Sequence, residues 1–305
     1  MKKETLLITL AFAVIYIVWG MTYLGVKIAI ESIPPFLMAG MRYTIAGILL
    51  YLFAFWRGIN RPTWQQLLNA LFIGVLFIGL GTGCVAWALQ YVDSGTTALV
   101  IAFQPLLTLL LVWLMLGRAP VLSSYIGIVL GIIGMAFLVL QDHIVGQTTS
   151  IWGLLMLLLS MSGWGYASVA VKGLQLPTPQ IHSTAAQMLG GGFVLILASS
   201  FLEDHSQFSF AAITTNSWLA FAFLIAFGSI LAFSCFNYLL QHVSPEKVST
   251  SNYVNPIIAM LLGWSVKDEI ITGQSIWAAI LMLVGVLFIN INIVEVLKEK
   301  RSRFV

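Results

Sequence analysis

The chain has 305 residues, of which 60% are apolar and only 8% are charged, and its formal net charge is +3. A soluble globular domain has about 25% charged residues, which it needs to cover its surface in water. The composition therefore excludes a soluble globular fold, and it also excludes disordered and collagen-like chains. We expect most of the chain to be surrounded by lipid.

Ten apolar segments are long enough to cross a membrane. A helix needs about 20 residues to span roughly 30 Å of hydrocarbon, and glycines, prolines and charges divide the sequence into ten such candidates. In chain order they are Leu6–Ile30, Phe36–Trp56, Leu67–Tyr91, Thr96–Leu116, Val121–Leu140, Ile151–Lys172, Ile181–Leu202, Trp218–Gln241, Val248–Val266 and Ser275–Ile293. The connecting loops are short, so we predict an all-α integral membrane protein whose consecutive helices pack antiparallel.

Basic residues predict how these spans are oriented, because Lys and Arg near span ends stay on the cytoplasmic side. With the N-terminus inside, 11 of the 14 lysines and arginines lie at inner segments. They are Lys2, Lys3, Arg57, Arg61, Arg118, Lys172, Lys247, Lys298, Lys300, Arg301 and Arg303. We therefore expect a multi-pass protein of the cell inner (plasma) membrane with both termini in the cytoplasm.

The sequence also contains an internal repeat. At 145 positions apart, Trp19, Lys27 and Pro34 match Trp164, Lys172 and Pro179, and at 151 positions apart, Cys84, Gln90 and Pro105 match Cys235, Gln241 and Pro256. These ordered matches of rare residues predict two domains, 1–143 and 144–305, of five transmembrane helices each. Because five is odd, the second copy enters the membrane from the opposite side, which gives an inverted pair of repeats. Such a pair has one arrangement open inward and one open outward, which predicts alternating access.

Several of these residues form a family pattern. Its parts are Trp19-Gly20, Lys27, Pro34, Arg42, Pro105, Asn255-Pro256, Leu261-Leu262-Gly263, Asp268-Glu269 and Gly285. The pattern resembles that of the drug/metabolite transporter superfamily, in particular its ten-span members with two EamA-type domains. The resemblance covers nearly the whole chain and implies efflux or exchange of small metabolites, amino acids or drugs. One departure is Gly117-Arg118-Ala119, because the family usually carries a glutamate after the fourth span.

The sequence gives no support to catalytic or metal-binding chemistry. Every Asp and Glu lies in a loop or at a span end, and the four histidines are equally peripheral, so no acid–base pair or triad can be assembled. Cys84 and Cys235 lie in separate apolar runs, where we expect free thiols rather than a disulfide or a metal site. We predict no enzyme activity, no cofactor and no metal. We interpret the glycine-rich segment 79–83 as a close helix contact rather than a phosphate loop.

Polar amides and aromatic rings inside the spans are the candidates for contact with a solute. Gln104 and Asn255 each precede a proline, which leaves the carbonyl one turn earlier without its helical partner. Within lipid, such a break is expected to face protein or a wet cavity. The predicted substrate-binding residues are Trp19, Tyr23, Trp87, Gln104, Trp164, Tyr166, Asn237, Tyr238, Asn252, Tyr253 and Asn255. The alternative is that the amides bridge helices and the rings serve as packing or interfacial anchors.

Arg42 is the one charge well inside a span, and it allows two interpretations. It either anchors the outer end of its helix through a carbonyl or Glu31, or it contacts a substrate carboxylate. The first span holds no acid between Tyr16 and Lys27. This absence disfavours the proton exchange that distant four-span relatives carry out on a glutamate there.

These observations together predict a secondary transporter that moves a small amphipathic, amino-acid-like or drug-like metabolite, by efflux or exchange. Its partners are expected to be the small-molecule substrate and membrane lipid, with no nucleic acid, and the chain is expected to act as a monomer or weak dimer. Two alternatives stay open. One is a solute importer of the same fold, and the other is a non-transporting intramembrane enzyme or scaffold.

Overall fold

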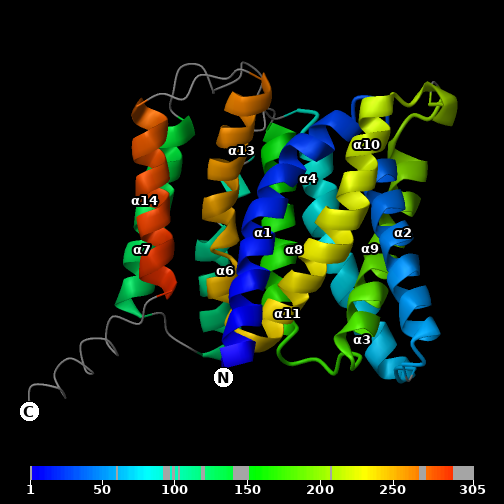
Figure 1. The fold of residues 1–305 in the computed structure, drawn as a ribbon, viewed down its shortest axis with the longest axis horizontal. Coiled ribbons are helices and arrows are strands. Elements are labelled where there is room, and N and C mark those ends of the chain that lie inside the picture. The colour runs from blue at the N-terminus through cyan, green and yellow to red at the C-terminus, as the bar shows by residue number, and fades with distance from the viewer. Residues whose placement is uncertain are drawn as a thin grey trace, which may run out of the picture.

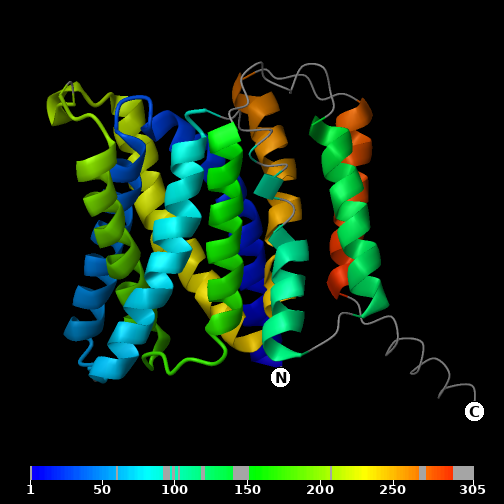
Figure 2. The ribbon, with the colours of Figure 1, turned by 180° about the vertical axis from the view of Figure 1, so that it is seen from behind.

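A computed structural model describes residues 2–59, 61–91, 97, 100–101, 104–117, 121–139, 151–206, 208–267 and 273–290. Within these residues the secondary structure is helical and contains no strand, which confirms the all-α prediction for the described part of the chain. The helices stand side by side as one bundle (Figure 1), and the view from behind shows the same arrangement (Figure 2).

The helices begin and end close to the predicted span boundaries. The first part of the chain forms α1 (Lys2–Ala29), α2 (Pro35–Trp56), α3 (Trp64–Gly74), the π-helix η1 (Val75–Thr82), α4 (Gly83–Ala88), α6 (Gln104–Leu116) and α7 (Leu122–Val139). The second part forms α8 (Ile151–Ala170), α9 (Gln180–Leu202), the 3₁₀-helix η2 (Phe210–Ala212), α10 (Thr215–Phe223), the π-helix η3 (Leu224–Phe233), α11 (Ser234–His242), α12 (Pro245–Val248), α13 (Ser251–Lys267) and α14 (Gly273–Asn290).

Among the described helices, 6 are long and apolar enough to cross a membrane. They cover Lys3–Ala29, Pro35–Trp56, Trp64–Ala88, Ile151–Ala170, Gln180–Leu202 and Thr215–His242. Shorter apolar helices cover Leu107–Leu116, Leu122–Gly134 and Ile276–Gly285. The chain is therefore a multi-pass membrane protein, whereas the count of ten spans, the two domains and the inverted repeat stay predictions.

Two of the long rods contain a π-helical segment, which the sequence analysis did not predict. The segment η1 runs without interruption between α3 and α4, and η3 runs between α10 and α11. Their last residues, Thr82 and Phe233, are 151 positions apart, which is the offset that aligns Cys84 with Cys235. Because π-helical turns are rare and concentrate at functional sites, a functional site is expected in the neighbourhood of these two segments.

Close approach of helices holds one side of the bundle together. The helix α9 packs along both α2 and α3, and Gly74 of α3 lies against the backbone of α9. A Cβ atom on Gly74 would overlap the carbonyl oxygen of Gln187. In lipid, where helix association depends on van der Waals packing, small residues of this kind allow such contact.

Glu203, the residue that follows α9, caps the N-terminus of α2. Pro34 precedes α2 and offers no side-chain cap for it. The carboxylate of Glu203 takes this role, since the backbone N–H groups of Phe36 and Leu37 donate to its oxygens at 2.6 and 3.0 Å. A negative charge at a helix N-terminus satisfies free donors and complements the helix dipole. The segment between α9 and α10 also contains the 3₁₀-helix η2.

The helices α7 and α14 form a pair at one edge of the bundle (Figures 1 and 2) and pack mainly on each other. Small apolar side chains and glycines bring them together: a Cβ on Gly134 would lie 2.8 Å from the carbonyl oxygen of Ala278. A separate hydrophobic cluster joins this pair to α6 and α13, and it includes Leu109, Tyr253 and Met282. The larger core lies among the remaining helices.

Candidate functional site

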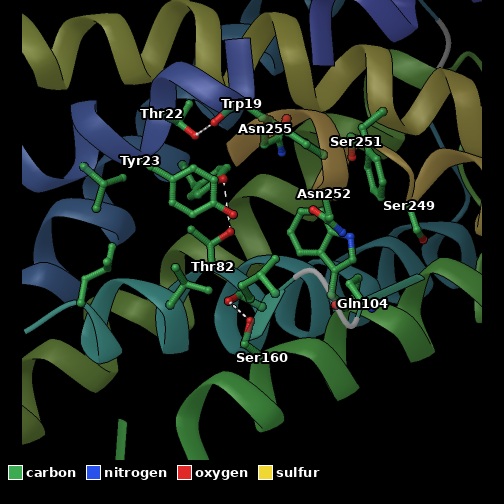
Figure 3. A pocket seen from close by; sticks show the side chains of 18 of the residues that line it. Trp19, Thr22, Tyr23, Thr82, Gln104, Ser160, Ser249, Ser251, Asn252 and Asn255 are labelled. Atoms are coloured by element: carbon green, nitrogen blue, oxygen red, sulfur yellow. Dashed lines mark hydrogen bonds between the residues drawn. The ribbon is translucent and has the colours of Figure 1, made fainter. Parts of the chain in front are cut away.

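A cavity of about 130 Å³ lies among helices from both parts of the chain. Its described wall comes from α1, α2, η1 and α4, and from α6, α8, α11 and α13 (Figure 3). The wall combines aromatic rings, amides and hydroxyl groups with one arginine. Such a mixture of apolar surface and a few convergent polar groups is typical of small-molecule sites.

Six of the predicted site residues line this cavity, and five do not. The six are Trp19, Tyr23, Gln104, Trp164, Asn252 and Asn255. The five that lie elsewhere among the described residues are Trp87, Tyr166, Asn237, Tyr238 and Tyr253. Substrate contact by any of the eleven stays a prediction.

Helix rotation separates near neighbours in the sequence. Trp164 lines the cavity, whereas Tyr166, two residues later, lies 43% exposed on the outside of the bundle. Asn252 lines the cavity, whereas Tyr253 is fully buried and faces Gly131 of α7. Each residue turns an α-helix by about 100°, so a shift of one or two residues moves a side chain to another face.

The other three make local contacts away from the cavity. Trp87 packs against Tyr91, with ring centroids 4.6 Å apart. Tyr238 packs in the same way against His242 at 4.1 Å. The amide of Asn237 is buried and lies 3.4 Å from the hydroxyl of Thr184. These contacts correspond to the packing and helix-bridging roles that the sequence analysis left open.

The aromatic part of the wall is a cluster of rings, of which Trp19 and Trp164 meet edge-to-face and Phe236 is tilted against both. Trp19 and Trp164 have centroids 5.6 Å apart at 79°, and Phe236 lies 5.1 Å from each of them. The indole of Trp19 also donates to the carbonyl of Gly228 at 3.4 Å. Edge-to-face packing fixes ring orientation, so these side chains offer a rigid apolar surface to a solute.

The amides of the wall differ in their hydrogen bonding. Gln104 donates to the hydroxyl of Thr108 and the carbonyl of Met161, at 3.1 and 3.2 Å. With its amide nitrogen toward the nearby carbonyls, Asn255 donates to those of Tyr16 and Ser251, at 3.1 and 3.0 Å. Both residues therefore bridge segments of the bundle while lining the cavity.

Asn252 is the amide of the wall that is open to another partner. Its side chain is half-buried, and the described residues provide it with no hydrogen bond. Figure 3 shows it between Gln104 and Asn255. Pro256 lies one turn later inside α13, and since proline has no N–H, the backbone carbonyl of Asn252 lacks its helical partner. A donor and an acceptor are thus left for a solute or water at this point.

Hydroxyl groups of the wall were missed by the sequence analysis. Thr22, Thr82, Ser160, Ser249 and Ser251 all line the cavity. Three of them lie one helical turn from a predicted residue: Thr22 from Trp19, Ser160 from Trp164 and Ser251 from Asn255. This spacing is a signal that extends a predicted face along a helix.

Arg42 lines the cavity as well, and it is only 3% exposed. Its Nε donates to the hydroxyl of Ser229 at 2.7 Å, and its Cζ lies 4.7 Å from the ring centroid of Tyr43. The predicted anchor, an outer carbonyl or Glu31, is therefore wrong for the described residues, because the side chain turns inward to Ser229 of η3. The alternative, contact with a substrate, stays open.

Three further expectations concern reactive groups. Cys84 and Cys235 are free thiols, as predicted. Gly81 allows close contact, since a Cβ there would lie 2.6 Å from Cε3 of Trp164, and this confirms the helix-contact interpretation of the glycine-rich segment. His182 is different, because its ring is buried beside Tyr51 rather than peripheral. The described residues contain no group of three or more metal-binding side chains.

Apolar spans around a cavity with a few convergent polar groups are an arrangement typical of membrane transporters. The model of the EamA-like transporter family matches residues 6–140 and again residues 151–291, and the chain belongs to this family. The chain is 35% identical to the "uncharacterized inner membrane transporter YedA" of Escherichia coli K12, over 90% of both chains.

Other relatives are more distant. The chain is 27% identical to the "uncharacterized transporter YoaV" of Bacillus subtilis, with 90% of this chain and 93% of that protein covered. It is 26% identical to a "WAT1-related protein, chloroplastic" of Arabidopsis thaliana, over 89% and 66% of the two chains. A solved crystal structure has the same fold, with a TM-score of 0.74, 21% identity and coverage of 92% and 95%.

Proposed function

We propose that this protein is a secondary transporter of the inner membrane that moves a small amphipathic solute by alternating access, outward or in exchange. The observation that carries the proposal is the cavity, because its wall joins α1, α2, η1 and α4 to α8, α11 and α13, which come from opposite halves of the chain. A solute bound there touches both halves at once. Movement of one half against the other would then open the site to either side of the membrane.

The two π segments support an inverted repeat of five spans each. They end 151 positions apart, and the family model matches twice, with the second match beginning shortly after the first ends. Two copies of opposite orientation have two arrangements of similar free energy, which is the physical requirement for a carrier.

The charge distribution supports an orientation with both termini in the cytoplasm. The start of α1, the end of α2 and the end of α14 lie at the same end of the bundle (Figure 1). Arg57 caps α2 at that end, and Lys2 and Lys3 begin α1. Basic residues near span ends favour the cytoplasmic side.

The wall of the cavity supports transport without proton coupling. Among the described residues that line it, none is Asp, Glu or His. Proton exchange requires a group that gains and loses a proton in the site, and amides and hydroxyls do not do so near neutral pH. Solute flux is therefore expected to follow the solute gradient in vesicles clamped at equal pH, whereas flux that requires a pH gradient would contradict this.

Counterflow into proteoliposomes tests the carrier directly. The protein is reconstituted, and uptake of labelled amino acids and other small metabolites is measured against an internal excess of each. Trp19→Ala and Asn255→Ala are expected to lower uptake at least tenfold without loss of reconstituted protein. Tyr166→Ala is the matched control, since its ring lies outside the bundle. Normal uptake in both cavity variants would remove them from the site.

Crosslinking separates a carrier from an enzyme or scaffold of the same fold. Pairs of cysteines are placed at the inner or at the outer ends of α6 and α13, in a variant without Cys84 and Cys235. A carrier gives two crosslinking patterns that exclude each other, and the transported solute shifts their ratio. A single fixed pattern would contradict alternating access.

Tests of solute uptake in right-side-out and inside-out vesicles distinguish export from import.

A further inference from the structure

Arg42 is the one charged side chain among the described residues that line the cavity. Burying a cation away from water is strongly unfavourable unless charge or hydrogen bonds compensate it. Here, no carboxylate of the described residues forms an ion pair with it, and its Nε donates a hydrogen bond to the hydroxyl of Ser229. The cavity therefore presents a positive charge that is only partly compensated.

The two Nη groups of Arg42 are the part that stays available. Neither donates a hydrogen bond to a described residue. Neither is completely buried without a partner, so both keep some accessible surface. The small accessible surface of this side chain, 3%, therefore includes these groups, and the cavity is the space that it lines. A guanidinium group with free Nη donors is suited to bind an oxyanion through two parallel hydrogen bonds.

The surroundings hold the guanidinium in a fixed position. Ser229 binds Nε, and the ring of Tyr43 lies beside Cζ. Gly228 leaves room for Nη2, because a Cβ there would lie 2.7 Å from that atom. Since Ser229 and Gly228 both belong to η3, the π-helical segment holds the cation that faces the cavity.

We propose that Arg42 forms an anion subsite that takes the carboxylate of an organic acid, with the apolar body of that acid against Trp19 and Trp164. This inference rests on the proposed transport function and specifies the class of solute that the site binds. The single cation favours a monoanion, because the second charge of a phosphate monoester would stay unpaired in this wall. The rings at 5.6 Å provide the apolar surface beside it.

A pair of probes that differ only in charge tests the subsite. Binding of tritiated 3-phenylpropanoate and 3-phenylpropanamide to the purified full chain in detergent is measured by scintillation proximity. The wild-type protein is expected to bind the acid at least tenfold more tightly than the amide. Arg42→Gln is expected to abolish this preference, chiefly through weaker binding of the acid. Arg57→Gln, at the exposed end of the same helix, is the control and keeps the preference.

A second variant covers the case in which Arg42→Gln does not yield monodisperse protein. Gly228→Ala keeps the charge but crowds Nη2, and it is expected to weaken acid binding several-fold while amide binding is unchanged. The proposal is overturned if wild-type protein binds neither probe or does not distinguish them, or if the folded variants keep its preference.

A different result would contradict the proposed transport function. Preferential acid binding that depends on Arg42, combined with no counterflow of any metabolite, would leave the subsite in place and remove the carrier role. Counterflow that responds neither to Arg42→Gln nor to the carboxylate of the solute would leave the carrier and remove the subsite.

Discussion

The two π-helical segments occupy corresponding places in the chain, yet side chains at several corresponding positions differ in size. At the offset of 151 positions, Phe77 and Ile78 of η1 correspond to Gly228 and Ser229 of η3. One turn later the relation reverses, because the smaller Thr82 corresponds to Phe233. Large residues in one segment thus stand where the other has small residues.

The contacts explain this exchange of size. Phe77 and Phe233 meet edge-to-face, with centroids 5.9 Å apart, so the large residues of the two segments pack on each other. The small residues then accommodate different neighbours: Gly81 accepts the indole of Trp164, and Gly228 accepts the guanidinium of Arg42. The comparison indicates that similar backbones hold an aromatic wall on one side and a cation on the other.

The largest effect is expected where the two segments meet. Phe233 is fully buried and contacts Phe77, Trp164 and Phe236. Phe233→Ala is expected to lower the free energy of unfolding by about 3 kcal/mol, because it leaves a cavity between packed rings. The measurement is unfolding in mixed micelles titrated with dodecyl sulfate.

The same segment provides the control for this variant. Phe227 is 49% exposed on the outside of η3, and Phe227→Ala is expected to change stability by less than about 0.5 kcal/mol. If both variants lose the same free energy, the contact between η1 and η3 is not what stabilises this part of the bundle.

A smaller loss is expected from crowding the small side of η1. A Cβ on Gly81 would lie 2.6 Å from the ring of Trp164, whereas one on Gly79 would have its nearest neighbour at 3.6 Å. Gly81→Ala is therefore expected to lower unfolding free energy by about 2 kcal/mol through overpacking and to reduce counterflow. Gly79→Ala is expected to leave both within error. The opposite order would mean that the indole of Trp164 has room to move.

The spans could be predicted from the sequence, because lipid requires an apolar run of fixed length for each crossing. Which face of each span points into the bundle could not be predicted from the sequence. Helices in lipid are apolar on all sides, so periodicity does not separate Trp164 from Tyr166 or Asn252 from Tyr253. Rotation about the helix axis decides between them, and only tertiary packing fixes that rotation.

The π segments and the contact of Arg42 with η3 could not be predicted from the sequence either. A π-helix has the composition of its α-helical neighbours and differs only in hydrogen-bond register. For Arg42 two interpretations were open, contact with a substrate carboxylate or an anchor at the outer end of its helix, and the second would direct the side chain outward. It turns inward instead, since Ser229 and Gly228 of a segment nearly 190 residues later in the chain form a polar site with room for it.

The link between Arg42 and η3 is expected to have a moderate effect. Ser229→Ala removes the acceptor of Nε, and the loss of a hydrogen bond to a charged group is expected to cost about 1.5 kcal/mol of unfolding free energy. Ser162→Ala is the matched control, because its exposed hydroxyl bonds only to the carbonyl of Leu158 in its own helix. Equal stability of the two variants would mean that Ser229 does not hold the guanidinium.

The smallest effect is expected where η1 contacts α2. The hydroxyls of Tyr43 and Thr82 lie 3.3 Å apart, which is long for a hydrogen bond between hydroxyl groups. Tyr43→Phe removes this contact but keeps the ring beside Arg42, so we expect a loss of about 0.5 kcal/mol. A double-mutant cycle with Thr82→Val isolates the pair, and a coupling energy near 0.5 kcal/mol is expected. A coupling several times larger would mean that this hydroxyl pair also helps to fix the ring of Tyr43 beside Arg42, so that η1 shares the role assigned to η3.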